Sequence, residues 1–174
     1  VDTFKIDTVV NSEIFTHSQY VAHKTKDAIA DQFKEKFGRR PNVDIEEPKF
    51  ILNVLVNDNF IRLSWDCSGE SLHKRGYRTA TGPAPINEVL AAGLIKISGW
   101  DLETPLIDPM CGSGTILIEA ALIATNTAPG LFRNHFCFMN FADFDRRLFL
   151  KVKNECKRDV KEIDGIITGH DKSW

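Results

Sequence analysis

Apolar residues follow two different periods over the first part of the chain. Phe4, Ile6 and Val9 alternate loosely with polar residues, which favours a strand within residues 1–15. From Ser18, which we expect to cap a helix, apolar side chains then recur at every fourth position as far as Gly38, where the helix should end. The members of this apolar helix face are Val21, Thr25, Ile29, Phe33 and Phe37.

Two apolar runs, at residues 50–56 and 60–66, are separated by a short polar segment, Asn-Asp-Asn. Asparagine and aspartate tolerate the left-handed backbone conformation of tight turns, so the pattern predicts a β-hairpin. In its second strand, Ile61, Leu63 and Trp65 should face one side of the sheet.

The second half of the chain alternates helical and strand patterns, as expected for an α/β fold. Helices are predicted over residues 85–98, with proline in the first turn, over 115–124 and around 144–160. Strands are predicted at 106–107 and 164–171. In the first of these helices, the expected buried face consists of Ile86, Val89, Leu90, Gly93, Leu94 and Ile97.

A glycine-rich turn joins the strand at 106–107 to the helix that follows it. Asp108 stands at the strand end and Gly112 and Gly114 lie in the turn, an arrangement typical of the ligand-binding corner of an open α/β sheet. The turn lacks the lysine of a P-loop, and Leu117 occupies the position where a dinucleotide fingerprint needs glycine or alanine. The remaining pattern, D-x-x-x-G-x-G, suits S-adenosylmethionine, because Asp108 and the backbone amides of the turn can bind its ammonium and carboxylate groups.

The composition is that of an ordinary globular chain: 43% of the 174 residues are hydrophobic and 26% are charged, with a net charge of -2. Any nucleic-acid site must therefore be a local basic patch. The four cysteines show no C-x-x-C spacing, which argues against a zinc site and favours reduced thiols in a cytoplasmic protein. No apolar run is long enough to span a membrane, and no signal peptide is recognisable.

Two segments carry a resemblance to a known family. The stretch D-P-M-C-G-S-G-T-I-L-I-E-A-A, residues 108–121, resembles motif I of RNA methyltransferases that carry an N-terminal THUMP domain. The run S-G-E-S-L-H-K-R-G-Y-R, residues 68–78, is the second hallmark, and A-P-I at 84–86 and S-G-W-D at 98–101 follow as in the family. The family includes bacterial guanine-N2 methyltransferases of large-subunit ribosomal RNA, and some relatives are described as adenine-N6 DNA methylases.

The resemblance implies an α/β fold class, namely the start of a Rossmann-like methyltransferase sheet preceded by a partial α+β THUMP domain. Residues 1–68 are assigned to the partial THUMP domain, 69–83 to a connector and 84–174 to the N-terminal part of the methyltransferase domain. The resemblance also implies that Ala84, Pro85 and Ile86, ahead of the first strand, line the cofactor site.

The candidate cofactor-binding residues lie at the two predicted strand ends. They are Asp108, Pro109, Met110, Cys111, Gly112, Ser113 and Gly114 in the turn, together with Asp171, whose carboxylate can take both ribose hydroxyls of a nucleoside. In the connector, Lys74, Arg75 and Arg78 give a local excess of positive charge. They are interpreted either as phosphate contacts to RNA or a wall of the cofactor crevice, or as ion pairs that pin a linker to both domains.

Four further features have two interpretations each. Glu119 is the only charge in an apolar helix, where a paired structural acid is favoured over a catalytic one. The phenylalanines between 132 and 144 favour core packing over base stacking. The lysines of the first helix are interleaved with acids, which favours a solvated face over an RNA contact. The helix around 144–160 is the most basic stretch, and it can face RNA or solvent.

The acceptor-site motif of the family, [N/D]-P-P-[Y/F], does not occur in this sequence. The sequence therefore predicts a piece of a longer enzyme, with its catalytic residues unassigned. The resemblance implies an S-adenosylmethionine-dependent methyltransferase that acts on the exocyclic amino group of an RNA base, a guanine of 23S ribosomal RNA, with RNA as its partner and neither metal nor membrane. Two alternatives are an adenine-N6 DNA methylase and a catalytically inactive module that binds RNA and cofactor.

Overall fold

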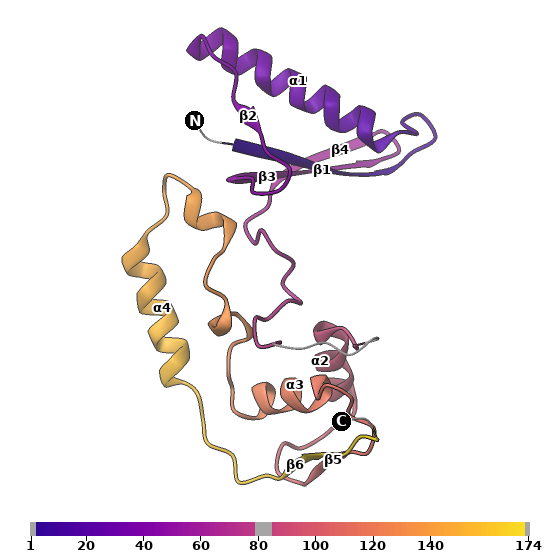
Figure 1. Ribbon diagram of the computed structural model, residues 1–174, viewed down its shortest axis with the longest axis vertical. Coiled ribbons are helices and arrows are strands. Elements are labelled where there is room, and N and C mark those ends of the chain that lie inside the picture. The colour runs from indigo at the N-terminus through magenta and orange to yellow at the C-terminus, as the bar shows by residue number, and fades with distance from the viewer. Residues whose placement is uncertain (1–2, 79–84, 173–174) are drawn as a thin grey trace. The chain divides into compact units, whose positions relative to one another are not determined.

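The structure is a computed structural model in which residues 3–78 and 85–172 are described (Figure 1). The chain forms two compact units, and each unit is made of two segments that are separated in the sequence. The first unit consists of Val1–Glu70 and His135–Phe144, and the second consists of Ser71–Asn134 and Asp145–Trp174.

The first unit is built on a four-stranded sheet with the order β2-β1-β3-β4 (Figure 1). Its strands are β1 (Thr3–Asn11), β2 (Asn42–Val43), β3 (Phe50–Asn57) and β4 (Phe60–Trp65). Strand β1 pairs in parallel with β2 and β3, whereas β3 and β4 form the predicted antiparallel hairpin. At its turn Asp58 has a φ of 50°, the left-handed conformation expected of this segment.

One face of β3 supplies three of the six buried hydrophobic residues that the structure describes in the first unit. Leu52, Val54 and Val56 are buried, and the residues between them are half-buried, which is the period of two expected of a strand. Every residue of β4 is exposed. Ile61, Leu63 and Trp65, which were predicted to share one side of the sheet, are therefore not buried. Trp65 instead contacts the ring of Phe50 at a centroid distance of 5.9 Å.

Helix α1 (Ser18–Phe37) follows the predicted span, with two corrections. The N-cap is His17 rather than Ser18, and its side chain makes no capping hydrogen bond, because Ser18 already has helical geometry. The helix ends as predicted at Gly38, whose φ of 70° lets its N–H donate to Lys34 O. The predicted apolar face is at best half-buried, and the buried residue of the helix is Ala30.

The aromatic segment His135–Phe144 belongs to the first unit although it lies far from the rest of that unit in the sequence. The ring of Phe141 stacks on Phe50 at 6.0 Å and meets the edge of Trp65 at 5.8 Å. The short 3-10 helix η2 (Cys137–Asn140) buries Cys137, and its burial raises the pKa of this thiol. These contacts support core packing as the role of the aromatic segment.

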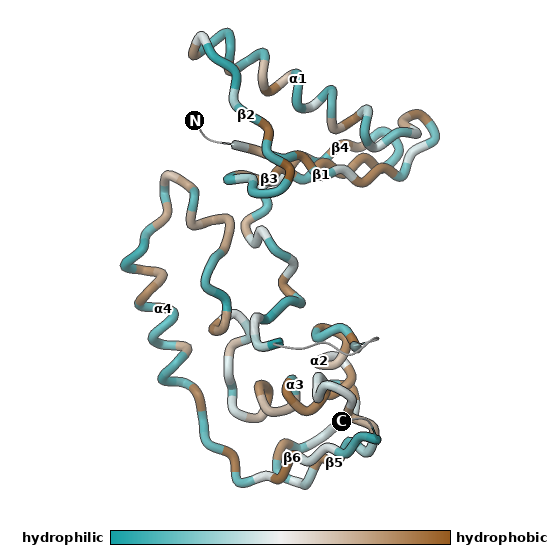
Figure 2. The backbone as a smooth tube through the Cα atoms, viewed as in Figure 1, coloured by the Kyte–Doolittle hydropathy of each residue, from teal (hydrophilic) through white to brown (hydrophobic). Residues whose placement is uncertain are grey.

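Within its described residues, 71–78, 85–134 and 145–172, the second unit combines three α-helices, one further 3-10 helix and two short strands (Figure 1). They are α2 (Glu88–Ile97), β5 (Leu106–Asp108), α3 (Thr115–Ala124), η1 (Pro129–Phe132), α4 (Arg146–Arg158) and β6 (Ile167–Gly169). Figure 2 shows α3 as an almost continuously hydrophobic tube, whereas α4 alternates between hydrophilic and hydrophobic residues. Strands β5 and β6 pair in parallel, as a Rossmann-like sheet requires.

Helix α2 differs from its prediction at both its start and its buried face. It begins at Glu88, because the Asn87 side chain accepts hydrogen bonds from the N–H groups of Val89 and Leu90 and so caps the helix there. The side packed against α3 carries Ala91 and Ile95. The predicted core residues Val89, Leu90, Leu94 and Ile97 are exposed. Helix α4 and strand β6 are also shorter than the spans predicted for them.

Truncation of Val56 should lower the stability of the first unit. Its side chain is fully buried, so Val56→Ala removes apolar contacts and leaves a cavity, with an expected loss of about 1–3 kcal/mol in the free energy of unfolding. Leu63→Ala in the exposed partner strand is the control, with a change below about 0.5 kcal/mol. Urea denaturation followed by circular dichroism measures both, and equal losses would contradict the assigned core.

Candidate functional site

The ends of β5 and β6 meet at one corner of the second unit. In the parallel register Asp108 lies opposite Gly169. The His170 N–H donates to Asp108 O at 2.9 Å, and the Cys111 N–H donates back to His170 O at 2.9 Å. The glycine-rich turn is thus joined by backbone hydrogen bonds to the end of the neighbouring strand. This is the edge at which open α/β sheets bind their ligands.

The two glycines of the turn are required by backbone conformation rather than by space. Gly112 has a φ of 52° and Gly114 a φ of 79°, and an added Cβ at either position would meet nothing within 4 Å. The Gly112 N–H donates to Asp171 Oδ2 at 2.7 Å, a short charge-assisted hydrogen bond. The structure therefore brings Asp108, the turn and Asp171 together, and leaves open space beside the glycines.

The other predicted cofactor residues line the same turn. The Met110 N–H donates to Asp108 Oδ1 at 3.1 Å, and the Met110 side chain is exposed. Pro109 and Ser113 are also exposed, and Cys111 is half-buried. Their contacts to a cofactor stay a prediction. Of the segment expected to line the site, Pro85 is exposed and Ile86 half-buried, while Ala84 lies outside the described residues.

A third glycine, Gly169, is required by close packing, and sequence reasoning missed it. A Cβ there would overlap Leu117 Cδ1 and lie 2.8 Å from Cys111 Sγ. The absence of a side chain lets the first turn of α3 and the glycine-rich turn pack directly on β6. A glycine inside a predicted strand is the signal that points to such a close approach.

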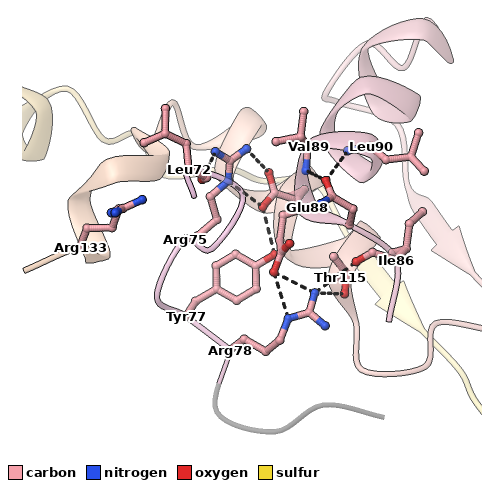
Figure 3. Close-up of polar contacts among 12 residues, drawn as sticks. Leu72, Arg75, Tyr77, Arg78, Ile86, Glu88, Val89, Leu90, Thr115 and Arg133 are labelled. Atoms are coloured by element: carbon pink, nitrogen blue, oxygen red, sulfur yellow. Dashed lines mark hydrogen bonds and ion pairs between the residues drawn. The ribbon is translucent and has the colours of Figure 1, made fainter. Parts of the chain in front are cut away.

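Behind the corner, Arg78 joins the first turns of α2 and α3 (Figure 3). Its Nε donates to Glu88 Oε1 at 3.0 Å, and its Nη2 donates to Thr115 Oγ1 at 3.0 Å and to Ile86 O at 3.3 Å. Glu88 and Thr115 are both buried. Arg78 Nη1 is buried too, and it has no hydrogen-bond partner among the residues that the structure describes. Arg78 therefore compensates a carboxylate that would be costly to bury alone.

Arg75 and Tyr77 form a second connection to α3 (Figure 3). The Tyr77 hydroxyl donates to Glu119 Oε1 at 3.0 Å, and the Arg75 guanidinium lies 3.4 Å from the same oxygen. Glu119 is 1% exposed, so both partners are needed to satisfy it. Burial, reinforced by the Glu119 carboxylate, raises the pKa of Tyr77 above its ordinary value. Glu119 is thus a paired structural acid, as its position in an apolar helix predicts.

These contacts bear on the three basic residues of the connector. Arg75 and Arg78 pair with glutamates of the second unit, whereas Lys74 is exposed. The ion pairs expected of a pinned linker are therefore present on the side of the second unit, whereas pinning to both domains and an RNA contact by these residues stay predictions. Sequence reasoning missed Glu88, Tyr77 and Thr115 as partners. The available signal was a lone acid in each apolar helix, which must find a cation or a hydroxyl nearby.

The described residues form neither a metal cluster nor a membrane-spanning helix. No three His, Cys, Asp or Glu side chains within residues 3–78 and 85–172 gather closely enough to hold a metal ion. None of the helices in those ranges combines the length and the apolar character needed to cross a membrane.

Comparison with known proteins identifies the two halves of the chain. Residues 75–174 match the model of the RMKL-like methyltransferase domain, and residues 1–66 match the THUMP domain. The chain therefore belongs to the RMKL-like methyltransferase family, in which a THUMP domain here precedes the methyltransferase domain. This confirms the predicted fold class, a mixed α/β chain in which a THUMP domain precedes a Rossmann-like methyltransferase domain.

Three solved structures illustrate the likeness. A candidate methyltransferase, SMU.472, in complex with SAH is 33% identical, with a TM-score of 0.84 over 99% of this chain and 46% of its own. A Listeria monocytogenes protein assigned as an N6-adenine-specific DNA methylase is 32% identical, with 0.81 over 97% and 45%. A candidate methylase from Clostridium difficile 630 is 28% identical, with 0.79 over 99% and 52%. The chain spans about half the length of these proteins.

A methyl group at Gly169 should disrupt the corner. Gly169→Ala forces Leu117 and Cys111 away from β6, so it should lower the free energy of unfolding by about 1–3 kcal/mol. Gly165→Ala is the matched control, because its Cβ would lie 3.4 Å from Leu102 O, an ordinary contact. It should leave stability unchanged or raise it by up to about 1 kcal/mol. Chemical denaturation decides, and a neutral Gly169→Ala would contradict the packing described.

Breaking the Arg78–Glu88 pair should cost more than removing both partners. Arg78→Met leaves the Glu88 carboxylate buried without its cation, so we expect a loss of about 3 kcal/mol or more in the free energy of unfolding. The double variant Arg78→Met/Glu88→Leu should recover most of this loss.

The exposed pair Arg40–Asp31 provides the control for this experiment. Arg40→Met should change the free energy of unfolding by less than about 1 kcal/mol, because the side chains of Arg40 and Asp31 are both more than half exposed. Denaturation of the four proteins gives the comparison, and a double variant no more stable than Arg78→Met would show that the pair is not the cause.

Proposed function

We propose that this chain forms the cofactor-binding part of an S-adenosylmethionine-dependent methyltransferase that acts on the exocyclic amino group of a base in RNA. The observation that carries the proposal is the corner itself. Asp108 and Asp171 follow two adjacent parallel strands, and the turn between them holds two glycines in left-handed conformations beside open space.

The chemistry of this corner fits the cofactor. S-adenosylmethionine carries an ammonium, a carboxylate and a ribose diol but no phosphate, so it needs acidic and amide partners rather than lysine. The Asp108 carboxylate suits the ammonium, and the backbone N–H groups at the start of α3, which have no acceptor within the helix, suit the carboxylate. Asp171 suits the ribose hydroxyls, and its hydrogen bond to the Gly112 N–H fixes the carboxylate at the turn. The SMU.472 structure, which contains SAH, supports the same cofactor for this chain.

When bound, the cofactor supplies an electrophilic methyl group on a sulfonium. This chain contributes its placement: the turn orients the amino-acid end, and Asp171 orients the sugar. The acceptor-site motif that would hold a flipped base does not occur in this sequence, so no catalytic residue is assigned to these 174 residues.

RNA is the favoured acceptor because the chain carries a THUMP domain ahead of the methyltransferase domain. Within RNA, the resemblance of residues 68–78 and 108–121 points to guanine N2 of 23S ribosomal RNA, in the cytoplasm. The second candidate is an adenine-N6 DNA methylase, which the assignment of the Listeria monocytogenes protein favours. Methyl transfer to RNA guanosine or DNA adenine by the longer enzyme that the sequence predicts, analysed as nucleosides by mass spectrometry, separates the two.

Neutralising either aspartate should weaken cofactor binding. Asp108→Asn and Asp171→Asn each remove a charge-assisted interaction, so the affinity for S-adenosylhomocysteine should fall about tenfold to a hundredfold. Glu162→Gln, an exposed acid of the same unit, should leave the affinity unchanged. Isothermal titration of the 174-residue chain tests this, with thermal unfolding as a check of the fold. Retained affinity in both aspartate variants would refute the assigned cofactor site.

A further inference from the structure

Helix α4 carries an excess of positive charge that the structure does not neutralise. Its thirteen residues include a single acid, Glu155, and six bases: Arg146, Arg147, Lys151, Lys153, Lys157 and Arg158. Within the described ranges 3–78 and 85–172, no ion pair joins any of these bases to a carboxylate, and no residue of the helix is buried. Like charges this dense repel one another along a helix unless a partner compensates them.

The spacing of the bases concentrates them on one side of the helix. Arg147, Lys151 and Arg158 are four and seven residues apart, so they form one stripe along the axis. Arg146 and Lys157, eleven residues apart, form a second stripe next to the first. Most of the apolar residues, Leu148, Phe149, Val152 and Cys156, occupy the other side. The basic side therefore presents a cationic strip about 16 Å long, taking about 1.5 Å per residue, with Leu150 and Asn154 as its intervening residues.

Helix α1 shows what an ordinary solvated face looks like in the same chain. Its four lysines are accompanied by Asp27, Asp31 and Glu35. Lys26 pairs with Asp27 at 3.1 Å, and Asp31 pairs with Arg40. The difference between the two helices is one of charge balance rather than of exposure, because both expose most of their residues.

We propose that the basic side of α4 is a docking surface for the phosphate backbone of RNA. The proposal rests on the RNA acceptor proposed above, and it adds a surface outside the cofactor corner. An unneutralised cationic strip matches a polyanion in charge, and it would position RNA through phosphates without reading its sequence. An anionic membrane would attract the same charges, but interfacial helices also offer a broad aromatic or leucine-rich face. Helix α4 does expose Leu148, Leu150 and Val152, but its aromatic residue, Phe149, is half-buried within the protein.

The test compares two triple variants of the 174-residue chain, with a fluorescein-labelled RNA hairpin of about 20 nucleotides as the probe. One variant is Arg147→Gln/Lys151→Gln/Arg158→Gln in α4, and the control is Lys24→Gln/Lys34→Gln/Lys36→Gln in α1. Glutamine keeps helix propensity, and circular dichroism checks the fold. Fluorescence anisotropy is measured from about 50 to 300 mM KCl, a range in which phosphate contacts weaken strongly.

The α4 variant should bind the hairpin at least tenfold more weakly at low salt, and its slope of log affinity against log salt should fall by about 2. The α1 variant should change affinity by less than about threefold. Equal losses in both variants, or none in α4, would overturn the proposal. So would α4-dependent binding to vesicles of phosphatidylcholine and phosphatidylserine without binding to the hairpin.

The result is distinguishable from a failure of the proposed function. S-adenosylhomocysteine should bind the α4 variant as it binds the parent chain, because none of the three residues lies in the cofactor corner. If neither protein binds S-adenosylhomocysteine, the cofactor assignment fails, while the comparison of hairpin affinities still decides the role of α4.

Discussion

Direct contact of the Leu117 and Cys111 side chains with the backbone of Gly169 packs α3 and the glycine-rich turn onto β6. Because this residue has no Cβ, Leu117 and Cys111 approach β6 closely, and the turn can exchange hydrogen bonds with the strand end at His170. Those hydrogen bonds keep Asp108 in register, and the Gly112 N–H then reaches Asp171. The two acids that define the candidate site are therefore neighbours because of a position that carries no functional group.

A second constraint comes from the connector, whose side chains satisfy two buried carboxylates. The two helices that cover the corner each bury one carboxylate, Glu88 in α2 and Glu119 in α3. Arg75, Tyr77 and Arg78 satisfy these carboxylates, so a loop without secondary structure fixes the separation of the helices. Buried ion pairs contribute more to defining one arrangement of the parts than to overall stability, because desolvation offsets much of their attraction.

Local sequence signals were enough to predict the helices, strands and turns. The buried helix faces and the side-chain partners depend on long-range packing, which the sequence did not reveal. The Asn-Asp-Asn turn, Gly38 and the glycines after Asp108 act through their own backbone conformations, so they could be recognised. The exposed face of α2 was mispredicted, because both of its sides are apolar and only contact with α3 decides that Ala91 is buried. The partners of Arg78 are ten and thirty-seven residues away in sequence, and no local pattern indicates such pairs.

The aromatic segment around Phe141 gives the two units an interlaced chain path. Since the polypeptide leaves the first unit after Glu70 and returns to it for His135–Phe144, neither unit is a single continuous stretch of sequence. A protein that ends at the border between the THUMP and methyltransferase matches would lack Phe141, whose ring contacts Phe50 and Trp65. A THUMP domain isolated in this way would expose aromatic surface that favours aggregation. Joining residues 135–144 to it through a designed linker would restore the missing contacts.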